Sequence, residues 1–124
     1  MAPKIEAFED LVVWKKTHAL VLEIYRLTRD YPSEEKFSLV SQMRRAAVSI
    51  AANIAEGFKK RTPRDKSNFY NISQGSLEEL RYYLILSTDL GYLKTNRDLT
   101  VLTEEIGRML NGLIKSMQAA GGRQ

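Results

Sequence analysis

Hydrophobic residues recur every three or four positions in four separate stretches of the chain, and no stretch alternates with the period of two typical of a β-strand. This pattern predicts four amphipathic helices, over about residues 9–30, 34–58, 63–90 and 96–119. Because the connections between them are short, consecutive helices are expected to pack antiparallel. The sequence therefore predicts an all-α fold, an up-down-up-down four-helix bundle that forms one domain over residues 1–124.

Residues that start or stop helices mark the boundaries of these stretches. Pro32 is expected to end the first helix, and Ser33 to cap the second through its hydroxyl. Gly57 is a candidate stop for the second helix, and Gly91 for the third. Thr62 precedes a proline, an arrangement typical of a helix start.

The same spacing predicts which side chains face the core. In the first helix these are Leu11, Trp14, His18, Val21, Leu22 and Tyr25. In the second they are Val40, Met43, Ala47, Ile50 and Ile54. In the third they are Phe69, Ile72, Leu77, Leu80, Leu84 and Leu90. In the fourth they are Leu99, Leu102, Ile106, Met109, Leu113 and Met117.

The second predicted helix has an unusual outer face, made of small side chains where a monomeric protein normally shows lysine and glutamate. This face consists of Ser41, Val48, Ala51, Ala52 and Ala55. Small residues let another helix backbone approach closely, and an apolar exposed face is costly in water. We expect a neighbouring subunit to cover it; the alternative is a solvated helix rich in alanine because alanine favours helix formation.

Between these two faces runs a polar line formed by Gln42, Arg45, Ser49, Asn53 and Glu56. Arg45 and Glu56 are too far apart to pair directly on one helix. We therefore expect Ser49, Asn53 and Glu56 to have a structural role and to hydrogen-bond between helices or subunits. A catalytic or ligand-binding role is the alternative.

Positive charge is concentrated in one part of the chain. The net charge is +4, and the excess lies in a segment with seven basic and two acidic residues. The basic residues are Arg44, Arg45, Lys59, Lys60, Arg61, Arg64 and Lys66. Phosphate contacts supply most non-specific affinity for nucleic acid, so this segment is a candidate binding surface; a solvated loop without a partner is the alternative. The interleaved Phe58, Phe69 and Tyr70 could stack on unpaired bases or plug the end of the core.

Several classes of protein are disfavoured by what the sequence lacks. With no cysteine and a single histidine, His18, it offers no thiolate, paired-histidine or di-iron site, and we expect no metal or cofactor. We expect His18 to be a packed residue, and the sequence has no glycine-rich phosphate-binding loop. We therefore do not expect the protein to be an enzyme. The longest uncharged run in the helical body, Ala46 to Ala55, is too short to span a membrane. With no signal peptide recognised, we expect a cytoplasmic protein.

The segment from Arg44 to Gly57, which reads RRAAVSIAANIAEG, carries a family resemblance. It resembles the signature of a bacterial four-helix bundle family encoded in intervening sequences of large-subunit ribosomal RNA genes and labelled ribosomal-protein-like. Further matching blocks are Phe8, Leu11 and Trp14; Tyr31-Pro32 and Phe37; Gly75-Ser76-Leu77 with Glu79-Leu80; and Gly91-Tyr92-Leu93. The chain is also similar to the accessory protein of diversity-generating retroelements, a ring that binds a reverse transcriptase and its RNA.

The resemblance implies a homopentameric ring whose basic surface meets nucleic acid. Together with the charge pattern it predicts a non-catalytic, oligomeric, nucleic-acid-binding protein, with RNA as the expected ligand. One alternative is an accessory protein with a reverse transcriptase as partner. Another is an assembly module that recruits a protein and binds no nucleic acid.

Overall fold

The computed structural model describes residues 4–121, which form four α-helices and, within that range, no β-strand. The helices are α1 (Val12–Thr28), α2 (Leu39–Lys59), α3 (Pro63–Asp89) and α4 (Arg97–Gly121). Two short 3-10 turns, η1 (Phe8–Asp10) and η2 (Ser33–Glu35), precede α1 and α2. The predicted all-α class is confirmed. No helix among the described residues is long and apolar enough to cross a membrane.

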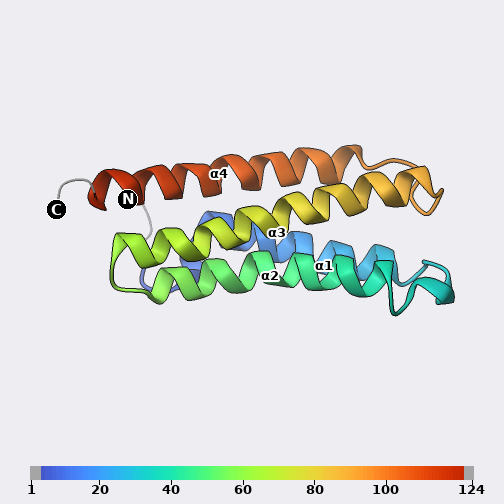
Figure 1. Cartoon of the computed structure of the whole chain (residues 1–124), viewed down its shortest axis with the longest axis horizontal. Helices are drawn as coiled ribbons and strands as arrows, with labels where there is room; N and C mark the ends of the chain where they lie inside the picture. The colour runs from blue at the N-terminus through green and yellow to red at the C-terminus, as the bar shows by residue number, and fades with distance from the viewer. Residues whose placement is uncertain (1–3, 122–124) are drawn as a thin grey trace.

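Each helix runs opposite to the one before it, so that the helix ends meet at the two ends of an elongated molecule (Figure 1). Helix α2 packs against α1 and α3, and α4 packs against α3 and, over a smaller area, against α1. Sequence neighbours are therefore neighbours in space, which is the up-down-up-down order. One hydrophobic core of residues from all four helices runs along the middle.

Helix α2 supplies the centre of this core, as its pattern predicts. All five side chains of the predicted stripe are buried, namely Val40, Met43, Ala47, Ile50 and Ile54. Facing them are Leu20 and Ile24 of α1, Leu77, Leu80 and Leu84 of α3, and Ile106 and Leu110 of α4.

The predicted inner face of α1 is only partly confirmed, because the helix is rotated toward its threonines. Val21 is buried, and Leu11 and Trp14 are half-buried against the core. The buried residues of the helix are Val13, Thr17, Leu20, Val21, Ile24 and Thr28, whereas His18, Leu22 and Tyr25 are exposed. The hydroxyl of Thr17 donates to the carbonyl oxygen of Val13 at 2.7 Å, and that of Thr28 to Ile24 at 2.6 Å. A threonine that satisfies its hydroxyl on its own helix presents a methyl group to the core, so it can replace an aliphatic residue there.

Hydroxyl residues also displace two predicted core residues of α3. Ser73 is fully buried and donates to the carbonyl oxygen of Ile50 in α2 at 2.9 Å, while Ile72 and Leu90 are about half exposed. In α4, Ile106 is buried as predicted, but Leu110 and Ile114 are buried in place of other predicted core residues. Four of the residues predicted to face the core are half-buried at its edge: Leu99, Leu102, Met109 and Leu113.

The predicted start of the second helix is also wrong, because α2 begins at Leu39 and not near residue 34. Ser33 is the first residue of the turn η2, well before Ser38 at the N-cap of α2, so it does not cap that helix. The Glu35 carboxylate instead accepts hydrogen bonds from the hydroxyls of Ser38 at 2.6 Å and Tyr92 at 2.8 Å. The bond from Tyr92 holds the α1–α2 connection against the α3–α4 connection.

Other boundaries lie closer to the predictions. Helix α1 starts three residues later than residue 9 because the Asp10 carboxylate accepts from the backbone N–H groups of Glu6 and Ala7 and stabilises η1 instead. Thr62 caps α3, accepting from the Asp65 N–H at 3.1 Å. Gly91 follows α3 with a φ of +83°, a conformation that favours glycine.

Replacing Tyr92 with phenylalanine is expected to raise the pKa of Glu35. Hydrogen bonds from Ser38 and Tyr92 hold the pKa of this carboxyl below its ordinary value. The group therefore adds stability above its unfolded pKa and loses that contribution as the pH falls through the lower folded pKa. An NMR titration of the Glu35 carboxyl carbon measures the change. Tyr82→Phe on the exposed face of α3 is the control and should leave this pKa unaltered.

Candidate nucleic-acid and subunit interfaces

Four of the predicted basic residues form one exposed group at the α2–α3 connection: Lys59, Lys60, Arg61 and Arg64, called the basic cluster below. Helix α2 ends at Lys59, Lys60 is extended, and α3 begins at Pro63, so the cluster occupies one end of the molecule. Within residues 4–121 no carboxylate forms an ion pair with any of the four. The cluster therefore presents cations that are not neutralised by neighbours.

Lys66 belongs to the same segment but is used within the fold. Its Nζ donates to the carbonyl oxygen of Phe58 at 2.6 Å, approaches that of Gly57 at 3.4 Å, and lies 5.3 Å from the centre of the Phe58 ring. Partial burial lowers the pKa of this ammonium group. A cation at these carbonyl groups stabilises the C-terminal end of α2.

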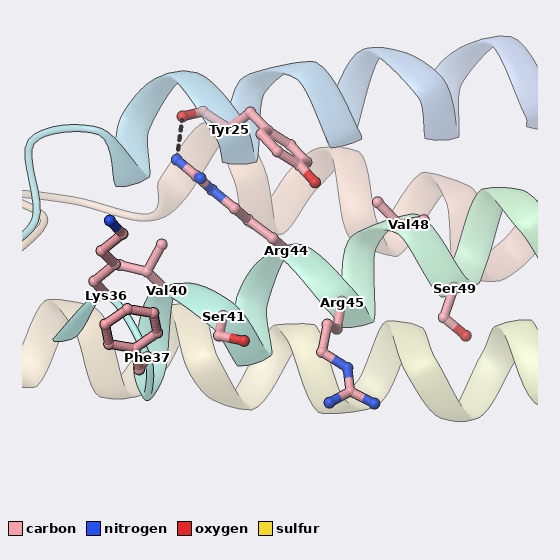
Figure 2. A pocket seen from close by; sticks show the side chains of 9 residues that line it. All are labelled: Tyr25, Lys36, Phe37, Val40, Ser41, Arg44, Arg45, Val48 and Ser49. Carbon is pink, nitrogen blue, oxygen red and sulfur yellow. Dashed lines mark hydrogen bonds between the residues drawn. The ribbon is translucent and has the colours of Figure 1, made fainter.

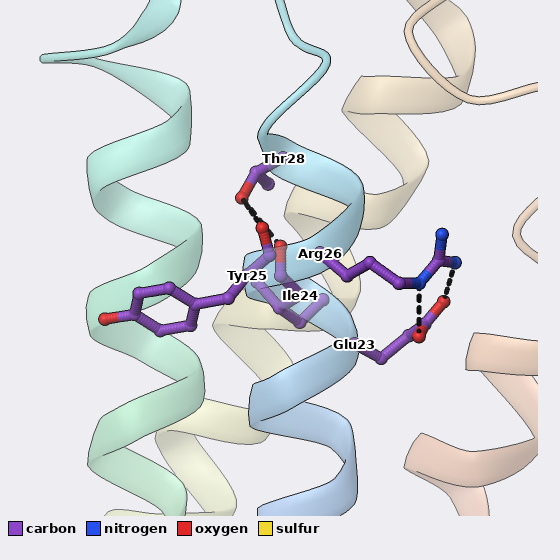
Figure 3. Close-up of polar contacts among 5 residues, drawn as sticks. All are labelled: Glu23, Ile24, Tyr25, Arg26 and Thr28. Carbon is purple, nitrogen blue, oxygen red and sulfur yellow. Dashed lines mark hydrogen bonds and ion pairs between the residues drawn. The ribbon is translucent and has the colours of Figure 1, made fainter.

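Arg44 and Arg45 lie elsewhere, since 15 residues of helix at 1.5 Å each place them roughly 20 Å from the basic cluster. Arg44 contacts the end of α1: its Nε donates to the Thr28 hydroxyl at 3.0 Å. An Nη of the same side chain approaches the Tyr25 carbonyl oxygen at 3.4 Å (Figure 2). Figure 3 shows the same Thr28 hydroxyl directed back at α1. The guanidinium also covers the Tyr25 ring at 4.6 Å. Arg45 is exposed.

The three aromatic residues beside the basic cluster mostly close the core. Tyr70 is 3% exposed, and burial raises the pKa of its phenol. Phe58 and Phe69 are half-buried, and the Lys60 Nζ lies 5.0 Å from the centre of the Phe69 ring. Of the two roles considered for these rings, stacking on a base is therefore open to Phe58 and Phe69 but not to Tyr70.

Part of the polar line of α2 bonds to α3. The Ser49 and Ser76 hydroxyls lie 2.8 Å apart, and the Asn53 amide donates to the Ser49 carbonyl oxygen at 2.8 Å and to its hydroxyl at 3.1 Å. Glu56, the third residue predicted to have a structural role, is exposed on the same helix.

The small residues of α2 form one wall of an apolar groove, and α1 forms the other. The groove has a volume of about 260 Å³ and is lined by Phe8, Trp14, His18, Val21, Val48, Ala51, Ala52 and Ala55. Trp14 stacks on His18 with ring centres 5.0 Å apart and meets Phe8 edge-on at 5.1 Å. Trp14 was predicted to face the core, whereas its half-buried ring shapes this groove.

Ser41, the fifth small residue, lies in a second hollow beyond Val48, with a volume of about 700 Å³ (Figure 2). Its lining includes Lys36, Phe37 and Arg45, and it contains no acidic residue. Phe37 is 87% exposed. The charge and hydrophobic patterns of the sequence assign no site role to Phe37 or Lys36, which both fall within the predicted second helix, residues 34–58. Between residues 4 and 121 no three metal-ligating side chains come together.

Helix order, core and surface together define a small bundle protein with an exposed basic end and an apolar groove. A family model described as 23S rRNA-intervening sequence protein matches residues 9–112, and the chain belongs to this family. A similar solved structure is that of a protein with unknown function from the S23 ribosomal protein family of Bacteroides thetaiotaomicron. It is 29% identical, with a TM-score of 0.74 over 84% of this chain and 96% of that one. No curated protein matches. The predicted family is confirmed; the similarity to the retroelement accessory protein stays a prediction.

Proposed function

We propose that the protein is a non-catalytic, cytoplasmic homo-oligomer that binds RNA through its basic cluster. The proposal of RNA binding rests on four exposed cations at one end of the fold, which have no ion-pair partners among the described residues. Such cations release counterions from phosphates on binding, which supplies affinity without reading sequence. The family description, which names an rRNA intervening sequence, is consistent with this ligand.

Neutralising the cluster is expected to abolish most of the RNA affinity. The variant K59A/K60A/R61A/R64A should bind a single-stranded RNA of about 20 nucleotides, longer than a typical single-strand site, at least tenfold more weakly at physiological salt. The slope of log affinity against log salt should fall by up to about 3, since each lost phosphate contact removes about 0.7. Fluorescence anisotropy at several salt concentrations measures both.

A matched control removes the same amount of charge elsewhere. The variant R29A/K94A/R97A/R108A replaces four exposed cations at the end of α1, in the α3–α4 connection and on α4. It should keep most of the salt slope. Equal losses in the two variants would mean that net charge, and not this surface, attracts RNA, and the site would be abandoned.

The oligomeric part of the proposal is supported by the outer face of α2. Val48 is 42% exposed and Ala52 is exposed, both in a groove with apolar walls. Burying such a face against another subunit removes apolar area from water. A pentamer is the assembly that the family resemblance leads us to expect, and sedimentation of the wild-type protein at micromolar concentration tests it. A monomer there would contradict the oligomeric part.

Two alternative roles can be distinguished from the proposed function by simple observations. An accessory protein of a retroelement should be encoded beside a reverse-transcriptase gene and should co-purify with that enzyme. An assembly module that recruits only a protein should show binding that tolerates salt, because apolar contacts are screened far less than phosphate contacts.

A further inference from the structure

Phe37 is the most exposed large hydrophobic residue that the structure describes, at 87%. It lies between the turn η2 and the start of α2, where the chain leaves the core. Phenylalanine is among the residues most often buried, so an almost fully exposed ring at a helix entrance is unusual. The Lys36 ammonium lies over the ring, 5.4 Å from its centre.

The groove between α1 and α2 is the complementary feature. Seven of its eight lining residues are apolar, with His18 the exception. The Phe8, Trp14 and His18 rings fix one wall by stacking, and three alanines keep the other wall low. A dry cavity of about 150 Å³ lined by apolar residues holds a benzene molecule. The volume of about 260 Å³ therefore has room for a phenyl ring.

Phe37 cannot fill the groove of its own chain. It precedes α2, whereas Ala52 lies 13 residues into that helix, a separation of roughly 20 Å. We propose that Phe37 of one copy inserts into the α1–α2 groove of a second copy. This inference rests on the oligomeric part of the proposed function and specifies the contact that forms the oligomer.

Continuity favours a second copy as the occupant. Val48 lines both the groove and the hollow beside Phe37, so ring and groove belong to one surface of α2. Every copy of the chain carries the exposed ring and the groove together, so a second copy supplies both halves of the contact. Because ring and groove are different sites, repeated contacts produce a reciprocal pair, a closed ring or an open filament, and the pentamer expected from the family resemblance corresponds to the closed ring.

Two surface variants test the contact from its two sides. Phe37→Ala removes the ring, and Ala52→Trp fills the groove from an exposed position. Each is expected to weaken self-association at least about tenfold, because a buried aromatic anchor typically dominates an interface. Sedimentation velocity measures this, and far-UV circular dichroism verifies the fold. Ile85→Ala, a change at another half-exposed hydrophobic residue, on α3, should leave the assembly intact.

Mixing the two variants gives the most specific result. The Phe37→Ala chain has a free groove but no ring, and the Ala52→Trp chain has a ring but no free groove. At a concentration where each variant alone is monomeric, an equimolar mixture should form a complex of one copy of each. Variants that were merely destabilised would not rescue one another.

The outcomes separate this inference from the wider proposal. A wild-type monomer would overturn both the contact and the oligomeric part, while RNA binding by the basic cluster would be judged by its own variant. A wild-type oligomer that survives Phe37→Ala would overturn the contact alone. If Phe37→Ala lost RNA affinity but kept the oligomer, the ring would belong to a nucleic-acid surface and the inference would be wrong.

Discussion

Replacing Gly57 with valine is expected to lower the free energy of unfolding by about 3 kcal/mol, at the upper end of what overpacking costs. Gly57 is buried where α2 crosses α3. A Cβ atom at this position would lie 2.7 Å from Cε1 and 3.0 Å from Cδ1 of Tyr70, and 3.1 Å from Cβ of Phe69. The Tyr70 ring is itself buried and the Phe69 Cβ is attached to the backbone, so neither can retreat cheaply.

Urea denaturation followed by circular dichroism measures this loss. Gly75→Ala is the matched control, because Gly75 is an exposed residue within α3 and no atom lies within 4 Å of an added Cβ. There the gain in helix propensity should stabilise the protein by about 0.5–1 kcal/mol. Equal effects at the two glycines would show that α2 and α3 are not held at the observed separation.

Gly57 also shows what the sequence could not reveal. A glycine near the end of a helical pattern is typical of a helix stop, yet α2 continues to Lys59 and Gly57 serves the close approach of α3. A helix stop and a close approach of two helices both favour glycine, so the residue type does not distinguish them. Only the position of Tyr70, 13 residues later and on another helix, distinguishes them.

The number, order and approximate extent of the helices follow from the apolar spacing, because amphipathic periodicity is a local property. The buried face of α2 follows for the same reason: its five apolar residues share one side and are all buried. The buried face of α1 cannot be predicted from the apolar spacing, because Thr17 and Thr28 are polar residues that are buried. Their hydroxyls bond to carbonyl oxygens of the same helix, which leaves their methyl groups facing the core. Ser73 is buried on α3 in the same way, bonded to α2.

Charge density along the sequence points to the basic cluster, but the structure does not bring all seven predicted cations together. Seven cations are close in sequence, whereas the last 14 residues of α2, a length of roughly 20 Å, separate Arg45 from the basic cluster in space. Lys66 and Arg44 have local partners in backbone carbonyl groups, which composition does not show. Phe37, in contrast, is not part of the predicted surfaces. The sequence places it inside the second helix, and its exposed position before α2 becomes evident only because the helix starts at Leu39.

An oligomer formed through α2 would also change how the basic cluster works. Each copy presents the cluster at the α2–α3 connection, so a ring repeats it once per subunit around one rim. Weak contacts with single phosphates then act together on one RNA, because binding of the first subunit raises the effective concentration of the strand at the next. Phe37→Ala would thereby lower RNA affinity only for strands long enough to span two subunits.

Replacing Arg44 with methionine is expected to destabilise the fold by about 2 kcal/mol, from the loss of a charge-assisted hydrogen bond and a cation–π contact. Its Nε donates to Thr28, and its guanidinium covers Tyr25, so the residue fastens the end of α1 to α2. Arg44→Lys should recover only part of the loss, because an ammonium group lacks the planar fork that reaches both partners.

The neighbouring Arg45→Met is the control for the Arg44 variant, with the same charge change at an exposed side chain and an expected effect within about 0.5 kcal/mol. Denaturation midpoints of the three variants measure the difference. Toward RNA, Arg44→Met and Arg45→Met should behave alike, because Arg44 is engaged with α1 and lies far from the basic cluster. Equal stability of the Arg44 and Arg45 variants, with a selective loss of RNA affinity at Arg44, would instead return this residue to the nucleic-acid interface.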